Sequence, residues 1–278
     1  NIFIKTMNRI NFFKIHNYLL LKYKSLYFCP VSINTGQIFS IDNEATFENV
    51  ALEIFKFQAE HCLVYKDYIF HLNINPSSIS AVKQIPFLPI SFFKTHEVLS
   101  TITEPEIVFS SSGTTGLTTS KHLVSDLKIY EESYNKAFKL FYTDPQEICI
   151  LALLPSYLER DGSSLIYMVD DLLKQSKHPK SGYFLHDLAS LYQTLLSLKE
   201  TKQKTILIGV TYALLDFAEQ FKIVFPDLIV METGGMKGRR EEMTREEVHQ
   251  ILTKAFSVNT IHSEYGMTEL LSQGYSKG

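Results

Sequence analysis

A run of hydroxyl-bearing residues and glycines could bind a phosphate group. The run is Ser110-Ser111-Ser112-Gly113-Thr114-Thr115-Gly116, and it follows directly on the apolar residues 107–109. Glycine leaves backbone N–H groups unhindered, and successive N–H groups can surround an anion together with Ser and Thr hydroxyls. Lys121 lies a few residues further on and could add a full positive charge for a triphosphate. The run therefore predicts a phosphate-binding loop.

Two common phosphate-binding motifs are excluded. Gly116 is followed by Leu117 instead of Lys and Ser or Thr, so the run is not the loop of P-loop NTPases, and the dinucleotide fingerprint GxGxxG is missing. A run of this composition can also be a solvent-exposed linker. Its position between an apolar strand and a helix expected to begin near Ser125 favours the phosphate loop.

A second loop follows the apolar run 227–231. It reads Glu-Thr-Gly-Gly-Met-Lys-Gly-Arg over residues 232–239 and contains Thr233, Gly234, Gly235 and Met236. Paired glycines at the carboxyl end of a strand allow a flat ring to approach the backbone closely. Taken alone, the loop could also be an ordinary turn.

A third loop, residues 262–269, follows the apolar run 258–262. It presents an aromatic ring, a hydroxyl and a carboxylate within five positions, as a metal–nucleotide site requires. These residues are Tyr265, Gly266, Met267, Thr268 and Glu269. Taken singly, Tyr265 could be a packing residue and Glu269 a solvated surface carboxylate.

An α/β pattern is expected to position these loops. Short apolar runs at 107–109, 147–154, 204–210, 227–231 and 258–262 predict strands covered on both faces. Between them, two helices are expected. The first begins near Ser125 and has one apolar stripe, made of Leu127, Tyr130, Tyr134, Ala137, Phe138 and Phe141. The second begins at Thr244, where Thr244-Arg245-Glu246-Glu247 is a capping box, and its buried face is made of Val248, Ile251, Leu252, Ala255 and Phe256. We expect crossover helices on a mainly parallel sheet.

The first part of the chain differs from this pattern. Residues 47–55 place apolar side chains at helical spacing, and residues 85–90 form an extended segment interrupted by prolines. We therefore expect a helical and irregular lead-in over residues 1–105, packed on an α/β nucleotide-binding core over residues 106–278, as one continuous large domain.

Composition excludes several other classes of protein. The chain has 278 residues, 45% of them hydrophobic, and 27 basic against 30 acidic residues, without the basic patch that a nucleic-acid partner requires. No apolar run approaches the roughly 20 residues of a membrane span, and residues 1–24 predict an amphipathic helix. Three scattered cysteines, Cys29, Cys62 and Cys149, suggest neither disulfides nor zinc, which fits a cytoplasmic location.

Together the three loops resemble the adenylate-forming superfamily, which includes acyl-CoA synthetases and peptide-synthetase adenylation domains. The match of Tyr265-Gly266-Met267-Thr268-Glu269 is specific, and that of Gly234-Gly235 is weaker. Within this superfamily the chain looks most like the acyl-protein synthetase of the bacterial luciferase fatty-acid reductase system (the LuxE family). That likeness extends to residues 85–94, 154–165 and 270–273, and so covers most of the chain from about residue 76.

The resemblance implies a large N-terminal domain of the adenylate-forming fold, ATP and Mg²⁺ as cofactors, and activation of a carboxylic, expected to be fatty, acid. Ser111, Ser112, Gly113, Thr114, Thr115 and Gly116, with Lys121, would hold the triphosphate. Thr233, Gly234, Gly235 and Met236 would border the adenine with Tyr265, Gly266 and Met267. Thr268 and Glu269 would be catalytic, and Glu269 would reach the metal.

The resemblance also implies transfer of the acyl group to a thiol, with an acyl-acceptor or reductase protein as partner. Two alternatives remain, an acyl- or aryl-CoA ligase of the phenylacetate-CoA ligase type and an inactive nucleotide-binding scaffold. The usual Pro-Lys-Gly of the family is replaced by Leu117-Thr118-Thr119-Ser120-Lys121, and the family's later aspartate and catalytic lysine have no counterpart before Gly278. A truncated or absent small C-terminal domain is therefore expected.

Overall fold

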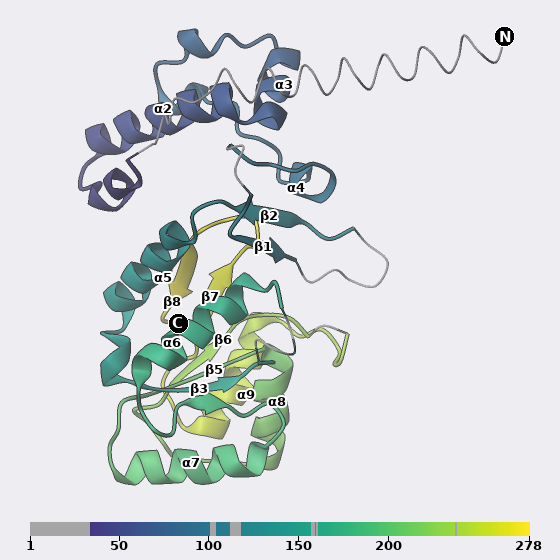
Figure 1. Cartoon of the computed structure of the whole chain (residues 1–278). Helices are drawn as coiled ribbons and strands as arrows, with labels where there is room; N and C mark the ends of the chain where they lie inside the picture. The colour runs from purple at the N-terminus through teal and green to yellow at the C-terminus, as the bar shows by residue number, and fades with distance from the viewer. Residues whose placement is uncertain (1–33, 101–103, 112–117, 157–158, 160, 237) are drawn as a thin grey trace, which may run out of the picture. The chain divides into compact units, whose positions relative to one another are not determined.

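The computed structural model describes residues 34–278 apart from 101–103, 112–117, 157–158, 160 and 237 (Figure 1). Residues 42–278 form one compact unit, and of the unit before it the structure describes η1 (Thr35–Ser40). The amphipathic helix expected at residues 1–24 lies outside the described residues. Across the described ranges, no helix is both long and apolar enough to cross a membrane.

The helices and strands of the second unit alternate along most of its length. The helices are α2 (Glu44–His61), α3 (Leu63–His71), α4 (Phe92–Thr95), α5 (Leu127–Phe141), α6 (Ser164–Ser176), α7 (Leu188–Glu200), α8 (Thr211–Gln220) and α9 (Arg245–Phe256), with the short 3-10 helices η2 (Pro76–Ser78), η3 (Val82–Gln84) and η4 (Pro145–Glu147). The strands are β1 (Ile107–Ser110), β2 (Lys121–Val124), β3 (Cys149–Leu153), β4 (Gly182–Tyr183), β5 (Thr205–Gly209), β6 (Ile229–Glu232), β7 (His262–Gly266) and β8 (Gln273–Ser276).

The main sheet has the order β4-β3-β5-β6-β7-β8 in the described part of the chain. Its first five strands are parallel, and β8 pairs antiparallel with β7. The chain runs from β3 outward to β4 and then back across β3 to β5, which reverses the direction in which strands are added. Because parallel crossovers are right-handed, this reversal places α6 on one face of the sheet and α7, α8 and α9 on the other.

Burial follows from this layering (Figure 1). Every residue of β3 and β5 is buried, as expected of central strands covered on both faces. On one face α5 joins α6, where the Tyr134 hydroxyl donates to Asp171 at 2.6 Å. On the other, Phe217 of α8 stacks on Phe256 of α9 with ring centroids 5.5 Å apart. The predicted α/β class, a mainly parallel sheet flanked by helices, is confirmed.

Two of the predicted strands differ from the expectation. Residues 107–109 form β1, but β1 pairs with β2 in a separate antiparallel hairpin instead of joining the main sheet. The run 258–262 is not a strand. β7 begins only at His262, where pairing with Met231 starts, so Tyr265 and Gly266 lie on the strand and not in a loop.

The two helices with predicted stripes are present. Asp126 caps α5, whose Tyr130, Tyr134 and Phe138 are buried. α9 has the predicted capping box, in which the Glu247 N–H donates to Thr244 Oγ1 at 3.2 Å and the Thr244 N–H donates to Glu247 Oε2 at 2.8 Å. Ile251 is 37% exposed, so its place on the buried face was predicted wrongly.

The early helices have their own small core. Phe55 and Ala59 of α2 pack with Tyr65 and Ile69 of α3, and residues 85–89 beside them have no regular secondary structure, as expected. Residues 107–275 contribute to a separate, larger core around the main sheet. A domain boundary at residue 105 stays a prediction.

Gly209, the last residue of β5, provides a test of packing at the centre of the sheet. A Cβ atom there would lie 2.8 Å from Leu153 Cβ and 3.0 Å from Leu214 Cγ. We expect Gly209→Ala to lower the free energy of unfolding by about 1–3 kcal/mol, the usual cost of overpacking, in urea titrations. Gly182→Ala is the matched control, because its Cβ would meet nothing closer than 4.0 Å. Equal stability of the two variants would contradict this packing.

Candidate nucleotide-binding site

Three loops lie at one edge of the main sheet, and the second and third of them contain candidate residues. The carboxyl ends of neighbouring parallel strands meet at the same edge, and ligands of such sheets bind there. Residues 154–163 follow β3, residues 233–244 follow β6, and residues 267–272 follow β7. The reversal of strand order lies between β3 and β5, next to the first of these loops.

The Ser/Thr/Gly run lies in sequence between the paired strands β1 and β2, so it joins two strands and not the strand and helix that the sequence suggested. Ser112, Gly113, Thr114, Thr115 and Gly116 lie outside the described residues. At the base of the loop, the Ser111 N–H donates to Ser120 O at 3.0 Å, and Ser111 Oγ accepts from the Ser120 N–H at 2.9 Å. Lys121 is exposed at the start of β2, opposite Ser110.

The hairpin is held against the loop that follows β3. The Ser110 N–H donates to Gly162 O at 2.7 Å. Gly162 has a φ of +76°, and a Cβ atom there would lie 3.0 Å from Ser110 Oγ, so conformation and space both favour glycine. Phe109 of β1 is fully buried between Tyr130 and Tyr167, with ring centroids 5.4 and 5.8 Å away. The predicted phosphate loop therefore begins from a fixed base.

A second contact ties the hairpin to the turn after β7. His122 Nδ1 lies 2.9 Å from Thr268 O, and Phe93 of α4 meets the imidazole edge to face at 5.4 Å. Burial lowers the pKa of His122, although the bond to Thr268 and the nearby Glu269 act in the opposite direction. The sequence pattern contained no signal for His122, because its partners are 29 residues before it and 146 residues after it.

The predicted Tyr-Gly-Met-Thr-Glu residues continue from β7 into a tight turn. Tyr265 is 67% exposed at the end of the strand. The Leu270 N–H donates to Met267 O at 3.0 Å, which places Thr268 and Glu269 at the centre of a β-turn. Glu269 is partly buried. The described residues include no group of three or more His, Cys, Asp or Glu side chains that could hold a metal ion.

The loop after β6 has the open backbone that paired glycines predict. Gly234 and Gly235 have φ values of +78° and +88°. A Cβ atom at Gly234 would meet nothing within 4 Å, so this stretch is free on its outer side. The Thr233 N–H donates to Gly209 O at 3.0 Å, and the Gly234 N–H donates to Glu232 Oε2 at 2.7 Å. The Met236 side chain points into the core, being 3% exposed.

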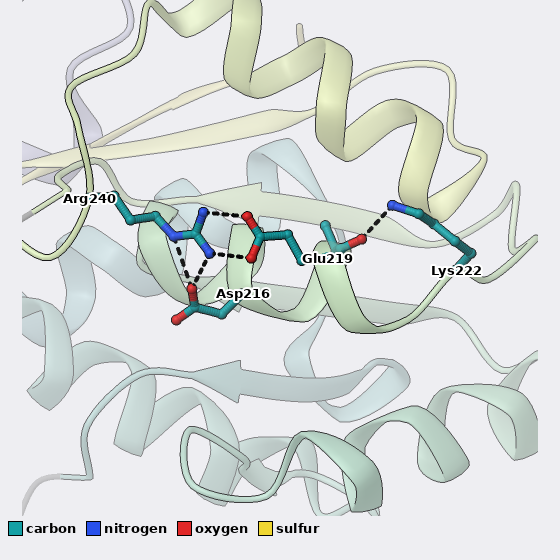
Figure 2. Close-up of polar contacts among 5 residues, drawn as sticks. Asp216, Glu219, Lys222 and Arg240 are labelled. Carbon is teal, nitrogen blue, oxygen red and sulfur yellow. Dashed lines mark hydrogen bonds and ion pairs between the residues drawn. The ribbon is translucent and has the colours of Figure 1, made fainter.

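Arg240 fixes the far end of the same loop on α8 (Figure 2). Its guanidinium donates to Glu219 at 2.7 and 2.9 Å and to Asp216 Oδ1 at 2.9 Å from Nε, with a further bond from Nη2 to Asp216. These bonds lower the pKa of Glu219 and raise that of Arg240. Arg239 lies over the Tyr212 ring, 4.7 Å from its centroid. The glycine pair is thus held between β5 and α8.

Glu264 is a buried carboxyl that the sequence analysis did not single out. It is 6% exposed on β7, and neither its Oε1 nor Gln273 Oε1 has a hydrogen-bond partner. Both atoms crowd Gly266, where a Cβ would lie 3.0 Å from Glu264 Oε1 and 2.2 Å from Gln273 Oε1. Burial, and then the charge on Glu232, raise the pKa of Glu264 to about 8. A neutral carboxylic acid could donate to Gln273, which an ionised one could not.

This raised pKa makes a prediction for stability. The folded chain binds the Glu264 proton more tightly than the unfolded chain, whose glutamate pKa is about 4.3. The protonated side chain therefore contributes fully to stability below about pH 4.3. This contribution is lost as the pH rises towards 8. Because an amide resembles the neutral acid, Glu264→Gln should melt only slightly above the wild-type temperature at pH 5 and well above it at pH 8.5. The difference should be several degrees, at about 2–4 °C per kcal/mol.

Thermal denaturation between pH 5 and pH 9 measures this difference. The groups that face Glu264 are Glu232, Tyr130, Tyr142 and Tyr275, and all of them remain in the variant. Glu246→Gln on the exposed side of α9 is the control and should leave the pH dependence unchanged. A Glu264→Gln curve parallel to that of the wild type would show that Glu264 titrates normally.

Comparison with known proteins shows what this fold is similar to. Protein-family models and curated proteins gave no match. Among solved structures, 2-hydroxyisobutyryl-CoA ligase in the postadenylation state with 2-HIB-AMP aligns with a TM-score of 0.55 and 12% identity, over 81% of this chain and 50% of that one. The same ligase with R3-HIB-AMP aligns with a TM-score of 0.53 and 11% identity, over 80% and 49%.

A third structure, coronafacic acid ligase from Pectobacterium brasiliense, gave a TM-score of only 0.33 at 17% identity, over 47% of this chain and 24% of that one, and carries no weight. This chain spans about half the length of the 2-hydroxyisobutyryl-CoA ligase chains. At these identities the likeness establishes the fold alone, which is the α/β fold that this chain shares with about half of the 2-hydroxyisobutyryl-CoA ligase chain.

Proposed function

We propose that this chain takes part in the ATP-dependent activation of a carboxylic acid, giving an acyl-adenylate and pyrophosphate. The observation that carries the proposal is the convergence of the hairpin base, the Gly234-Gly235 loop and the Thr268–Glu269 turn at the carboxyl edge of the sheet. The similar ligase was captured with an adenylate, 2-HIB-AMP, in its postadenylation state. Shared fold and converging motifs support the same reaction class here.

The geometry supports a division of roles for the nucleotide. The exposed Tyr265 ring is available for stacking on adenine, and the open backbone at Gly234 leaves room for the ring on the other side. We propose that Ser111 to Gly116, with Lys121, hold the β- and γ-phosphates through backbone N–H groups, hydroxyls and charge. Thr268, at the centre of its turn, would donate its hydroxyl to the α-phosphate.

The chain's contribution to the reaction is positioning and charge stabilisation. A carboxylate oxygen of the acid attacks the α-phosphorus, and the bond to the bridging oxygen of pyrophosphate breaks. Donors preorganised around the leaving group stabilise the charge that develops on it. Mg²⁺, when bound, would neutralise part of the phosphate charge. A single partly buried carboxylate, Glu269, fits this ion, because Mg²⁺ on a nucleotide is usually held by one or two carboxylates, phosphates and water.

The finer proposal is that the acid is a fatty acid and that the acyl group passes to a thiol, as in an acyl-protein synthetase. Two cysteines of this chain do not fit the acceptor role. Cys62 and Cys149 are buried, and burial raises the pKa of Cys149 to about 11, which suppresses the thiolate. Cys29 lies outside the described residues. The acceptor is therefore proposed to be a thiol other than Cys62 and Cys149.

Coenzyme A is the second candidate acceptor. The observation that favours it is the fold shared with a CoA ligase over 81% of this chain. An inactive nucleotide-binding scaffold is a third alternative, which the presence of Tyr265, Thr268 and Glu269 disfavours. The two active alternatives share the adenylation step and differ in the thiol.

Carboxylate-dependent ATP–pyrophosphate exchange tests the shared step. We expect exchange by the wild type with one class among fatty and aromatic acids, and a loss of about 10²-fold or more in Glu269→Gln, because the amide removes the negative charge expected to hold the metal. Thermal melting checks that the variant is folded.

Glu246→Gln is the matched control and should exchange at the wild-type rate, since Glu246 is exposed on α9. Adding coenzyme A or a candidate carrier protein then separates the acceptors by the thioester formed. ATP binding without exchange, for every acid offered, would leave only the scaffold.

A further inference from the structure

His122 connects three segments that are far apart in the sequence. It lies on β2, one residue after Lys121 and just beyond the Ser/Thr/Gly run. Its Nδ1 bonds to Thr268 O at 2.9 Å, and Phe93 of α4 packs edge-on against its ring. Phe92, next to Phe93, in turn contacts Tyr68 of α3 at 5.6 Å. A single imidazole thus links the early helices, the hairpin and the turn after β7.

The bonded carbonyl belongs to the central peptide of the Met267–Leu270 turn. This peptide, between Thr268 and Glu269, is the unit whose orientation distinguishes type I from type II turns. Glu269 is not among the described residues with positive φ, as a type I turn requires. Because the peptide is planar and trans, fixing the Thr268 carbonyl toward His122 directs the Glu269 N–H to the opposite side. The bond therefore sets the direction of both groups.

We propose that His122 is a positioning residue that locks the Thr268–Glu269 peptide toward bound nucleotide while holding the turn next to the phosphate-loop hairpin. This inference rests on the proposed adenylation. His122 would touch neither the phosphates nor the acid, and would act through Thr268 and Glu269. It would keep two binding elements in register that otherwise belong to separate sheets, the β1–β2 hairpin and the β7–β8 pair.

The bond also fixes the hydrogen on the imidazole. A carbonyl oxygen only accepts, so Nδ1 must carry a proton, and in the neutral ring Nε2 must then be bare. The position of this proton can be tested directly, because it depends neither on bound nucleotide nor on activity. It also identifies the replacement that keeps the bond, since the amide nitrogen of Asn lies where Nδ1 lies in His.

Two substitutions separate the hydrogen bond from the packing of the ring. In the full chain, His122→Leu keeps apolar contact with Phe93 and loses the donor, whereas His122→Asn keeps the donor and loses the ring. We expect His122→Leu to lower kcat of ATP–pyrophosphate exchange about tenfold, the value of one well-placed hydrogen bond. KM for ATP should change by less than about twofold, because the hairpin and adenine contacts remain. His122→Asn should recover most of the lost rate.

Nitrogen NMR of the imidazole gives an independent readout on the wild type without nucleotide, and should show Nδ1 protonated. Melting temperatures near wild type for both variants would confirm that they fold. The positioning role is overturned by an unchanged kcat in His122→Leu, by equal losses in both variants, or by a neutral ring that carries its proton on Nε2 and none on Nδ1. A wild type that exchanges with no acid overturns the proposed function and the positioning role together. In that case a proton on Nδ1 would show that the bond from His122 to Thr268 serves only the folded structure.

Discussion

Parallel pairing of β3, β5, β6 and β7 is the constraint on which the candidate site depends. Each parallel strand needs a crossover connection that brings the chain back to the end where the previous strand began. The loops that follow these strands therefore all lie at the carboxyl edge of the sheet, whatever their sequences. The buried, apolar β3 and β5 fix the centre of this arrangement. Residues as far apart as Gly162, Gly234 and Thr268 are brought to that edge by backbone topology. Side-chain chemistry then decides what the edge binds.

The β1–β2 hairpin is not part of that sheet and needs separate attachment. A two-stranded hairpin alone is at best marginally stable in water. Phe109 supplies the apolar anchor between Tyr130 and Tyr167, and two hydrogen bonds set the direction, from Ser110 to Gly162 and from His122 to Thr268. These contacts involve α5, α6 and the loops after β3 and β7. The base of the predicted phosphate loop is therefore placed by tertiary contacts, and the sequence of the loop does not determine where that base lies.

The sequence predicted those features that depend on local pattern. Continuous apolar runs marked β3 and β5, the capping box marked the start of α9, and loop composition marked the three candidate loops. Pairing with a distant strand was harder to predict. The run 258–262 contains the β-branched residues Val258, Thr260 and Ile261, yet pairing with β6 begins only at His262. The antiparallel strands β2 and β8 were missed because Lys121, His122, Gln273 and Gly274 give no apolar alternation, and pairing with β1 and β7 defines them.

The same distinction applies to the site. Tyr265, Thr268 and Glu269 could be proposed because their spacing carries a recognisable pattern. His122 and Glu264 could not, since their roles arise from a carbonyl 146 residues away and from burial against β8 and α5. Both roles arise from tertiary structure, which no local motif encodes.

The distribution of charge constrains how this edge could hold a triphosphate. Arg240 is engaged with Asp216 and Glu219, Arg239 lies on Tyr212, and Arg245 donates to Ser263 and Ser276. These cations are therefore already held by protein groups. Backbone N–H groups, Lys121 and a divalent cation would then carry most of the neutralisation. Burial raises the pKa of Glu264 to about 8, which favours its neutral form at neutral pH and lowers the negative charge on β7. An ionised Glu264 would instead repel Glu232, so its neutral form favours folding.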